Sequence, residues 1–359
     1  MIGLRAALER TVLVVFGVAV ALGVAEVAAR VAAPKPVAPA PRGPSVDPKR
    51  TTAGWSLFDY AKPHVRAFMP GGAFYRTNRH GFRGREYAAR KPAGVFRVVI
   101  VGDSVTMGFG VAENEAYPAL LETALNAGAA GKAVRYEVLN LGVPGAHLGV
   151  VAPRLEGSSL RFDPDLIVYG WTVNDIEGDG YRKTTPSPEE MGRRMQALAA
   201  SPFARSALVR VVQLHWWALR DVTIPPPDSY VHEVRWNYFH NAEAWADFSS
   251  GLDRLARVQE ERRVCVAVFL HTHLYALNFL HPIRAIYRRV EEAARERGLL
   301  VIDSFDAHRG RAARPMWVGA MDPHPNPRGH RILGEALFDG LTQAPPACWR
   351  GSHPIEEGA

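Results

Sequence analysis

The sequence feature that most constrains the fold is an apolar run that stops abruptly at Gly102-Asp103-Ser104. Its residues Val98–Val101 are continuous and β-branched, which is typical of a strand buried on both faces of a sheet. Helically spaced apolar residues follow, so Ser104 is predicted at an exposed strand-to-helix corner. Open α/β sheets bind ligands at the carboxyl ends of their strands. An isolated Gly-Asp-Ser is most simply a turn. Whether Ser104 has a functional role depends on the segments downstream.

Five apolar segments predict the strands of a single parallel sheet. They lie at about residues 97–101, 136–140, 166–169, 264–270 and 299–303, with helical patterns between them. Because strands and helices alternate, each connection is expected to cross the sheet in the right-handed sense. A closing helix is predicted with Asn326 as its N-cap and Pro327 as its first residue.

Three downstream segments also end in small or polar residues. They are Leu139-Asn140-Leu141-Gly142, the stretch from Leu166 to Asn174-Asp175, and Met321-Asp322-Pro323-His324. In this order, with Gly102-Asp103-Ser104, they resemble the four signature blocks of the SGNH (GDSL-type) hydrolase superfamily. The resemblance extends over about residues 95–341. It implies an α/β fold, a three-layer α/β/α sandwich around a five-stranded parallel, flavodoxin-like sheet.

The resemblance also implies a role for five residues. Ser104 would be the nucleophile, His324 the base, and Asp322 the carboxylate that orients the histidine ring. Gly142 through its N–H and Asn174 through its amide would form the oxyanion hole together with the N–H of Ser104. A serine hydroxyl is a weak nucleophile alone, which is why the histidine is needed.

The spacing of the last block departs from the commoner family pattern. Only Pro323 separates Asp322 from His324, whereas two residues usually lie between them. His330 is the alternative base, but it falls within the predicted closing helix.

Other polar residues at the same sheet edge have open roles. His271 and His273 follow the fourth predicted strand and could bind substrate or a metal. No third ligand with recognisable spacing accompanies them, so neither a metal nor another cofactor is predicted. Asp103 and Asp175 are expected to stabilise their turns.

The N-terminal segment is apolar enough to cross a membrane. From residue 11 to residue 33 only Glu26 and Arg30 are charged, and they lie four residues apart, so they can pair on a helix. Two arginines before the run favour a cytoplasmic N-terminus. We expect an uncleaved transmembrane helix that precedes the α/β domain, and a cleaved signal peptide is the alternative. Either way the domain lies outside the cytoplasm, in the periplasm or beyond the cell.

The composition along the chain predicts its domain layout. After the anchor at residues 1–33, residues 34–50 form a Pro-rich linker, and residues 51–94 a region with a hairpin around 73–77. The hydrolase-like domain is predicted at residues 95–345. It holds a long insertion at about 176–262 and is followed by a tail at 346–359.

The region before the domain contains the motif Asn78-x-x-Gly81-Phe82-Arg83. It resembles a leader found in many membrane-anchored SGNH-like proteins. The arginines Arg79, Arg83 and Arg85 could line a site for an anionic substrate, or could be surface residues on a packing hairpin, which we favour.

The insertion is predicted to be helical at residues 189–219 and 243–262, with a Pro-rich loop between them. Because it follows a catalytic block, it could cover the site. Trp236 and Tyr238 would then stack on sugar rings or an acyl chain, or they could pack the insertion on the core.

Charge and cysteine content add two constraints. The net charge of +7 comes from scattered arginines, and no nucleic-acid-binding module is visible. Cys265 is expected to pack as a small apolar residue. A bridge to Cys348 is not expected, although an oxidising compartment would permit one.

These features together predict a membrane-anchored serine esterase that forms an acyl-enzyme. Its substrate would be an acyl ester of an envelope polysaccharide or a lipid. One alternative is a polysaccharide O-acyltransferase with the same residues. The other is a non-catalytic envelope-binding protein, but such a protein would be expected to lose Ser104 or His324.

Overall fold

The structure is a computed structural model that describes residues 2–32, 62–69, 72–130, 133–185, 193, 206–209, 212, 229–319 and 322–349. The chain divides into two compact units. One comprises Met1–Ala38 with Thr184–Ser229, and the other comprises Pro39–Lys183 with Tyr230–Ala359.

The first unit is dominated by the long helix α1 (Ile2–Ala32). Its segment Val14–Val31 has a mean hydropathy of 2.0, so its length and composition suit a membrane span or a signal sequence. Glu26 interrupts the apolar surface and accepts hydrogen bonds from the N–H groups of Ala207 and Leu208, at 2.9 and 2.8 Å. The Arg30 side chain also donates to it, at 2.8 Å. Part of the long insertion thus packs against α1.

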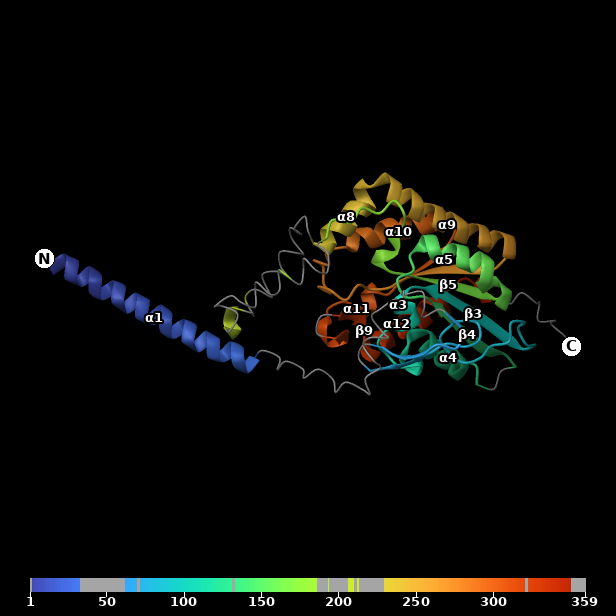
Figure 1. The fold of residues 1–359 in the computed structure, drawn as a ribbon, viewed down its shortest axis with the longest axis horizontal. Helices are drawn as coiled ribbons and strands as arrows, with labels where there is room; N and C mark the ends of the chain where they lie inside the picture. Colours follow the sequence, from blue (N-terminus) through green and yellow to red (C-terminus); the bar gives the residue numbers. More distant parts are fainter. Residues whose placement is uncertain are drawn as a thin grey trace. The chain divides into compact units, whose positions relative to one another are not determined.

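The second unit is built on a five-stranded parallel sheet (Figure 1). Its strands are β3 (Val95–Gly102), β4 (Arg135–Gly142), β5 (Leu166–Trp171), β6 (Cys265–Leu270) and β7 (Leu300–Asp303). The strand order is β4-β3-β5-β6-β7, which is the flavodoxin-like order. The predicted α/β fold and its five strands are confirmed, with every strand end within two residues of its predicted position.

Alternate residues of the central strand β3 enter two separate cores. Val99 and Val101 belong to the core under α5 (Leu148–Arg154), α9 (Ala242–Arg262) and α10 (Arg284–Glu296). Val98 and Ile100 belong to the core under α4 (Tyr117–Gly128) and α12 (Pro327–Thr342) on the other face. Figure 1 shows these helices on opposite sides of the sheet. Since both faces are covered, the run Val98–Val101 within this strand is wholly apolar, and this made it recognisable.

Shorter elements complete the second unit. A hairpin of β1 (Arg66–Phe68) and β2 (Phe74–Arg76) lies where one was predicted. A second antiparallel pair, β8 (Trp317–Gly319) and β9 (Asp322–Pro325), was not predicted. The remaining short helices are α3 (Ser104–Met107), α11 (Phe305–His308), η2 (Glu113–Glu115), η3 (Leu155–Ser159), η4 (Leu160–Phe162), η5 (Val173–Ile176), η7 (Arg314–Met316) and η8 (Pro346–Trp349).

The later part of the insertion, from residue 229 on, contains the helices α8 and α9. The helix predicted at 243–262 is present as α9. It is preceded by α8 (Tyr230–His240), which the sequence did not predict. The helix predicted at 189–219 lies almost wholly outside the described residues.

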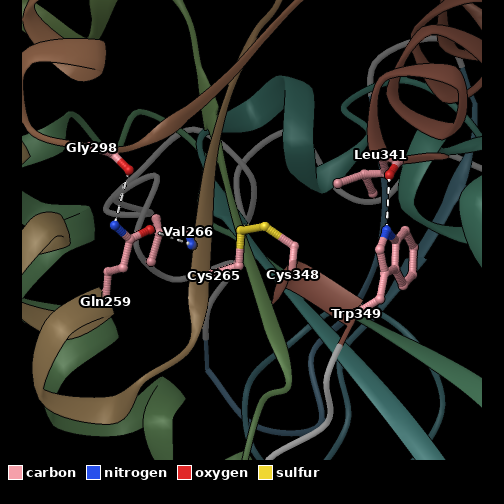
Figure 2. Close-up of a disulfide and its surroundings, with 7 residues drawn as sticks. All are labelled: Gln259, Cys265, Val266, Gly298, Leu341, Cys348 and Trp349. Carbon is pink, nitrogen blue, oxygen red and sulfur yellow. Dashed lines mark hydrogen bonds between the residues drawn. A yellow bond between two sulfur atoms is a disulfide. The ribbon is translucent and has the colours of Figure 1, made fainter. Parts of the chain in front are cut away.

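The expectation that the two cysteines stay apart is wrong. Cys265, at the start of β6, forms a disulfide with Cys348, in η8 (Figure 2). Nearby, the Trp349 indole donates to the carbonyl oxygen of Leu341 at 3.1 Å, and its ring packs on Phe96, with ring centroids 5.4 Å apart. The segment Pro346–Trp349 therefore packs on the domain. The sequence separation of 83 between the cysteines hid this proximity from the sequence.

Candidate active site

Ser104 lies at the strand-to-helix corner predicted for it. β3 ends at Gly102, and Ser104 is the first residue of α3. Asp103 caps this helix, because its Oδ1 accepts a hydrogen bond from the N–H of Val105 at 2.9 Å. A Cβ atom on Gly102 would lie 2.7 Å from the carbonyl oxygen of Gly170 on β5. The close approach of β5 to the end of β3 therefore needs a glycine at position 102.

Two hydrogen bonds connect Ser104, His324 and Asp322. The Oγ atom of Ser104 lies 2.9 Å from Nε2 of His324, and Nδ1 of the same ring lies 2.6 Å from Oδ1 of Asp322. The second bond lowers the pKa of the Asp322 carboxyl, so this carboxyl stays ionised. A serine, a histidine base and an orienting carboxylate are the parts of an activated nucleophile.

The short Asp322-Pro323-His324 spacing has a structural reason. These residues belong to the strand β9, and side chains two positions apart on a strand point to the same face. The His324 N–H also donates to Asp322 Oδ1, at 3.1 Å. One intervening residue therefore suffices to place the carboxylate beside the imidazole.

The assignment of Gly142 to the oxyanion hole is corrected by the structure. Its N–H already donates to Oδ1 of Asn140 at 3.1 Å. A Cβ atom on Gly142 would lie 2.3 Å from the backbone nitrogen of Met107, so this glycine serves the packing of α3 on β4. Gly142 does not line the cavity beside Ser104, whereas Gly145 does.

Gly145 sits in a tight turn that follows β4. Pro144 precedes it, Gly145 has φ +69°, and the Ala146 N–H donates to the Val143 carbonyl oxygen at 3.1 Å. This is the pattern of a type II turn, with proline and glycine at its two central positions. The Gly145 N–H donates to no described residue, and so it is free to bind an oxyanion in the cavity.

Asn174 lines the same cavity, and its side-chain oxygen accepts a hydrogen bond from Thr172. The Thr172 hydroxyl also lies 2.8 Å from Oδ2 of Asp103. Because the oxygen of the amide is engaged, its NH₂ group remains as a donor. The sequence did not single out Thr172, since a lone threonine after a strand carries no pattern.

The carboxyl groups of Asp103 and Asp175 are buried, and both lie within hydrogen-bond distance of Thr172. Burial raises the pKa of Asp103. It raises the pKa of Asp175 further, and the charge of Asp103 adds to that increase. The Asp175 Oδ2 atom accepts hydrogen bonds from the Tyr169 hydroxyl and the Thr172 N–H, both at 2.8 Å.

A cavity of about 390 Å³ opens beside Ser104. Its lining includes Ser104 and His324 together with the apolar residues Phe109, Val173 and Leu274. The Phe109 ring packs on His324, with ring centroids 4.7 Å apart. The lining also includes the polar residues Glu177, Tyr230 and His273. The other residues that line the cavity are Asp103, Val105, Pro144, Gly145, Thr172, Asn174, His271, Thr272, Pro323 and Pro325.

The four tentative substrate-binding residues lie in different places. His273 faces the cavity, and burial lowers the pKa of its imidazole to about 4, so the ring is neutral at pH 7. His271 borders the cavity, but both its ring nitrogens are buried. Trp236 does not line the cavity, and Arg182 stacks on its ring. Tyr238 is corrected to a core residue, since it is fully buried and accepts a hydrogen bond from Trp171.

His330, the alternative base, is far from this role. It is fully buried in α12, and its Nδ1 accepts a hydrogen bond from the Tyr117 N–H at 3.3 Å. Burial lowers the pKa of this imidazole to about 3. Within the described ranges, no group of three or more His, Cys, Asp or Glu side chains could hold a metal ion.

The arginines of the leader are either paired with carboxylates or buried. Arg79 pairs with Glu86, and Arg85 pairs with Glu122. Arg83 is 1 % exposed, so it is not a surface residue.

Residues 100–332 match the family model described as GDSL-like Lipase/Acylhydrolase family. The chain belongs to this family of ester-hydrolysing enzymes, since the match covers more than half of its length. No curated protein matched the chain in sequence.

Solved structures with a similar fold include an acetylxylan esterase and a protein named TesA. Axe2, an acetylxylan esterase from Geobacillus stearothermophilus, is 16 % identical, with a TM-score of 0.42 over 69 % of this chain and 95 % of its own. TesA is also 16 % identical, with a TM-score of 0.42 over 70 % of this chain and 99 % of its own.

Proposed function

We propose that this protein cleaves acyl esters through an acyl-enzyme on Ser104. The observation that carries the proposal is the pair of hydrogen bonds from Ser104 to His324 and from His324 to Asp322, next to an open cavity. In the first step the Ser104 Oγ attacks the ester carbonyl carbon while its proton passes to His324 Nε2. The ionised Asp322 stabilises the imidazolium that forms.

The developing oxyanion would be held by three donors. These are the N–H groups of Ser104 and Gly145 and the side-chain NH₂ of Asn174. The donors are fixed before the reaction, so little reorganisation is needed when charge develops on the oxygen. When the intermediate collapses, His324 gives its proton to the leaving alcohol. A water molecule, activated by the same histidine, then releases the acid and restores Ser104.

The cavity supports an ester with an apolar acyl part and a hydroxylated alcohol part. Phe109, Val173 and Leu274 form an apolar wall that would hold the acyl group. His273 is neutral at pH 7, so its ring offers one N–H donor and one acceptor. A substrate hydroxyl matches this pair of functions. We infer an acylated envelope glycan or a lipid ester as the substrate class.

The location we propose is outside the cytoplasm, on a membrane anchor near the N-terminus. The apolar surface of α1 suits a bilayer, and the Glu26–Arg30 pair lies near one end of the apolar segment, where long side chains can reach the polar boundary. The disulfide supports an oxidising compartment. Alkaline carbonate extraction should leave the full-length protein in the membrane pellet. A mature N-terminus near Ala33 would show a cleaved signal instead.

The function is tested by following both products of a small acyl ester, with and without an envelope glycan. The wild type should release alcohol and free acid in equal amounts, and Ser104→Ala and His324→Ala should release neither. If the alcohol appears only with the glycan, and the acyl group moves to the glycan, the protein is an O-acyltransferase with the same residues. If the wild type turns over no ester under either condition, a binding role replaces the enzymatic one.

A further inference from the structure

The leader motif forms a closed turn that directs Arg83 into the domain. Asn78 Oδ1 accepts hydrogen bonds from the N–H groups of His80 and Phe82, at 2.9 and 3.2 Å. Gly81 has φ +80°, a backbone conformation that favours glycine, and its N–H donates to the Asn78 carbonyl oxygen at 3.0 Å. These contacts give the asparagine and the glycine of the Asn-x-x-Gly-Phe-Arg motif a structural role. They hold the turn that directs the Arg83 side chain into the domain.

The buried guanidinium of Arg83 binds the backbone that follows the nucleophile helix. Its Nη1 donates to the carbonyl oxygens of Met107, at 2.9 Å, and of Gly108, and its Nη2 donates to that of Val111. A Cβ atom on Gly108, which has φ +84°, would lie 2.9 Å from this Nη1. The guanidinium therefore packs directly on the backbone, and its planar group of N–H donors can form hydrogen bonds with several carbonyl oxygens at once.

The loop held by Arg83 carries the aromatic ring that packs on the proposed base. Phe109 lies between the Gly108 and Val111 contacts, and its ring packs on His324. The same loop is held at Gly110, whose N–H donates to the Met69 sulfur at 3.3 Å. Met69 and Tyr75 of the hairpin region also pack on Met107, the last residue of the nucleophile helix. The leader therefore contacts both the nucleophile helix and the Phe109 loop.

We propose that Arg83 is a positioning residue for the reaction, acting through loop 107–111. This inference rests on the proposed function, because it assumes that Ser104 and His324 react. By binding the carbonyl oxygens on either side of Phe109, Arg83 keeps the Phe109 ring on His324, which fixes the imidazole opposite Ser104. Small displacements of reacting groups are costly, since a misplacement of 1 Å can lower a rate about 10²-fold.

The test measures the rate at which a fluorophosphonate probe labels Ser104, which needs no knowledge of the substrate. Arg83→Met keeps the length of the side chain and removes its donors. It should slow labelling by about 10²-fold. Arg83→Lys, which retains charge but serves fewer carbonyls, should lie between Arg83→Met and the wild type. The matched control is Arg85→Met. Arg85 pairs with Glu122 in the same segment and does not touch the loop, so its labelling rate should equal that of the wild type.

A double-mutant cycle with Phe109→Ala separates positioning from a merely structural role. If Arg83 acts through Phe109, then Arg83→Met should slow labelling much less in the Phe109→Ala background. Equal slowing in both backgrounds would overturn the inference, as would an unchanged rate in folded Arg83→Met. If Arg83→Met does not fold, Arg83→Lys and Met69→Leu, which loosens the Gly110 contact, carry the same comparison. An unlabelled wild type would instead refute the proposed function itself.

Discussion

Thr172 offers the sharpest test of the proposed oxyanion hole. Thr172→Val keeps the shape of the side chain and removes the hydroxyl that bonds Asn174 and lies 2.8 Å from Asp103. Thr172 is buried, so two polar partners lose a contact, at a cost of about 1–3 kcal/mol in the free energy of unfolding. The Asn174 amide is then free to rotate away from the oxyanion.

The effect on the rate has an upper limit set by Asn174 itself. Removal of one oxyanion donor lowers kcat by about 10²–10³, or roughly 2.7–4 kcal/mol, and this is expected for Asn174→Ala with little change in KM. Thr172→Val should lower kcat by about tenfold or more without exceeding that loss, because the amide is still present but less well oriented. Thr172→Ser retains the hydroxyl and should behave like the wild type.

Measurement of kcat and Tm on the same preparations shows whether the Thr172 hydroxyl orients Asn174 or only stabilises the loop. If Thr172→Val lowers Tm and leaves kcat unchanged, the hydroxyl only braces the loop and does not orient Asn174. If Asn174→Ala also retains the wild-type kcat, Asn174 is not an oxyanion donor.

Three further predictions concern the base, the disulfide and the buried acids. His324→Ala should abolish ester turnover, whereas His330→Ala should lower Tm and leave most activity in the folded fraction; the reverse result would show that the base is misassigned. Replacement of Cys265 and Cys348 by serine should lower the free energy of unfolding by about 4–5 kcal/mol in the chain-entropy model for a separation of 83 residues, while the folded enzyme keeps its rate. An unchanged denaturation midpoint would count against the bridge. The raised pKa of Asp175 means that the folded state loses stability as pH rises above the unfolded value of about 3.9. Asp175→Asn should remove this pH dependence of stability. The Tm of the variant minus the Tm of the wild type should therefore increase from pH 4 to pH 8. A constant difference in Tm would refute the raised pKa of Asp175.

The sheet was predictable because its strands are buried on both faces. Val98–Val101 and Leu166–Tyr169 are continuous and apolar, and no amphipathic pattern competes with this signal. The helix α8 was missed for the opposite reason. It follows a Pro-rich stretch and mixes His, Glu, Arg and Asn with aromatic residues, so no apolar face stands out. Its Tyr238 resembled a binding aromatic in sequence and is a core residue in the structure.

The sequence predicted those site residues whose side chains the chemistry requires. It did not predict the residue whose role depends on the direction of its backbone N–H. Ser104 and His324 were singled out from their blocks, and the structure brings them together. Gly142 ends β4 and Gly145 lies three residues later, and only the three-dimensional turn shows which N–H is free. Pro144-Gly145 is itself a type II turn signal, and it could have pointed to the second glycine. The contacts of Arg83 span 24 to 28 residues, a separation at which the sequence carries no pattern.

The central claim is that Ser104 becomes covalently acylated. The most direct measurement is peptide mass spectrometry of the full-length protein after incubation with a fluorophosphonate probe. The account predicts one probe adduct, on the peptide that contains Ser104, and none in Ser104→Ala. It also predicts that His324→Ala reacts far more slowly, because the hydroxyl then lacks its base. An adduct on another residue, or labelling that persists in Ser104→Ala, would contradict the account.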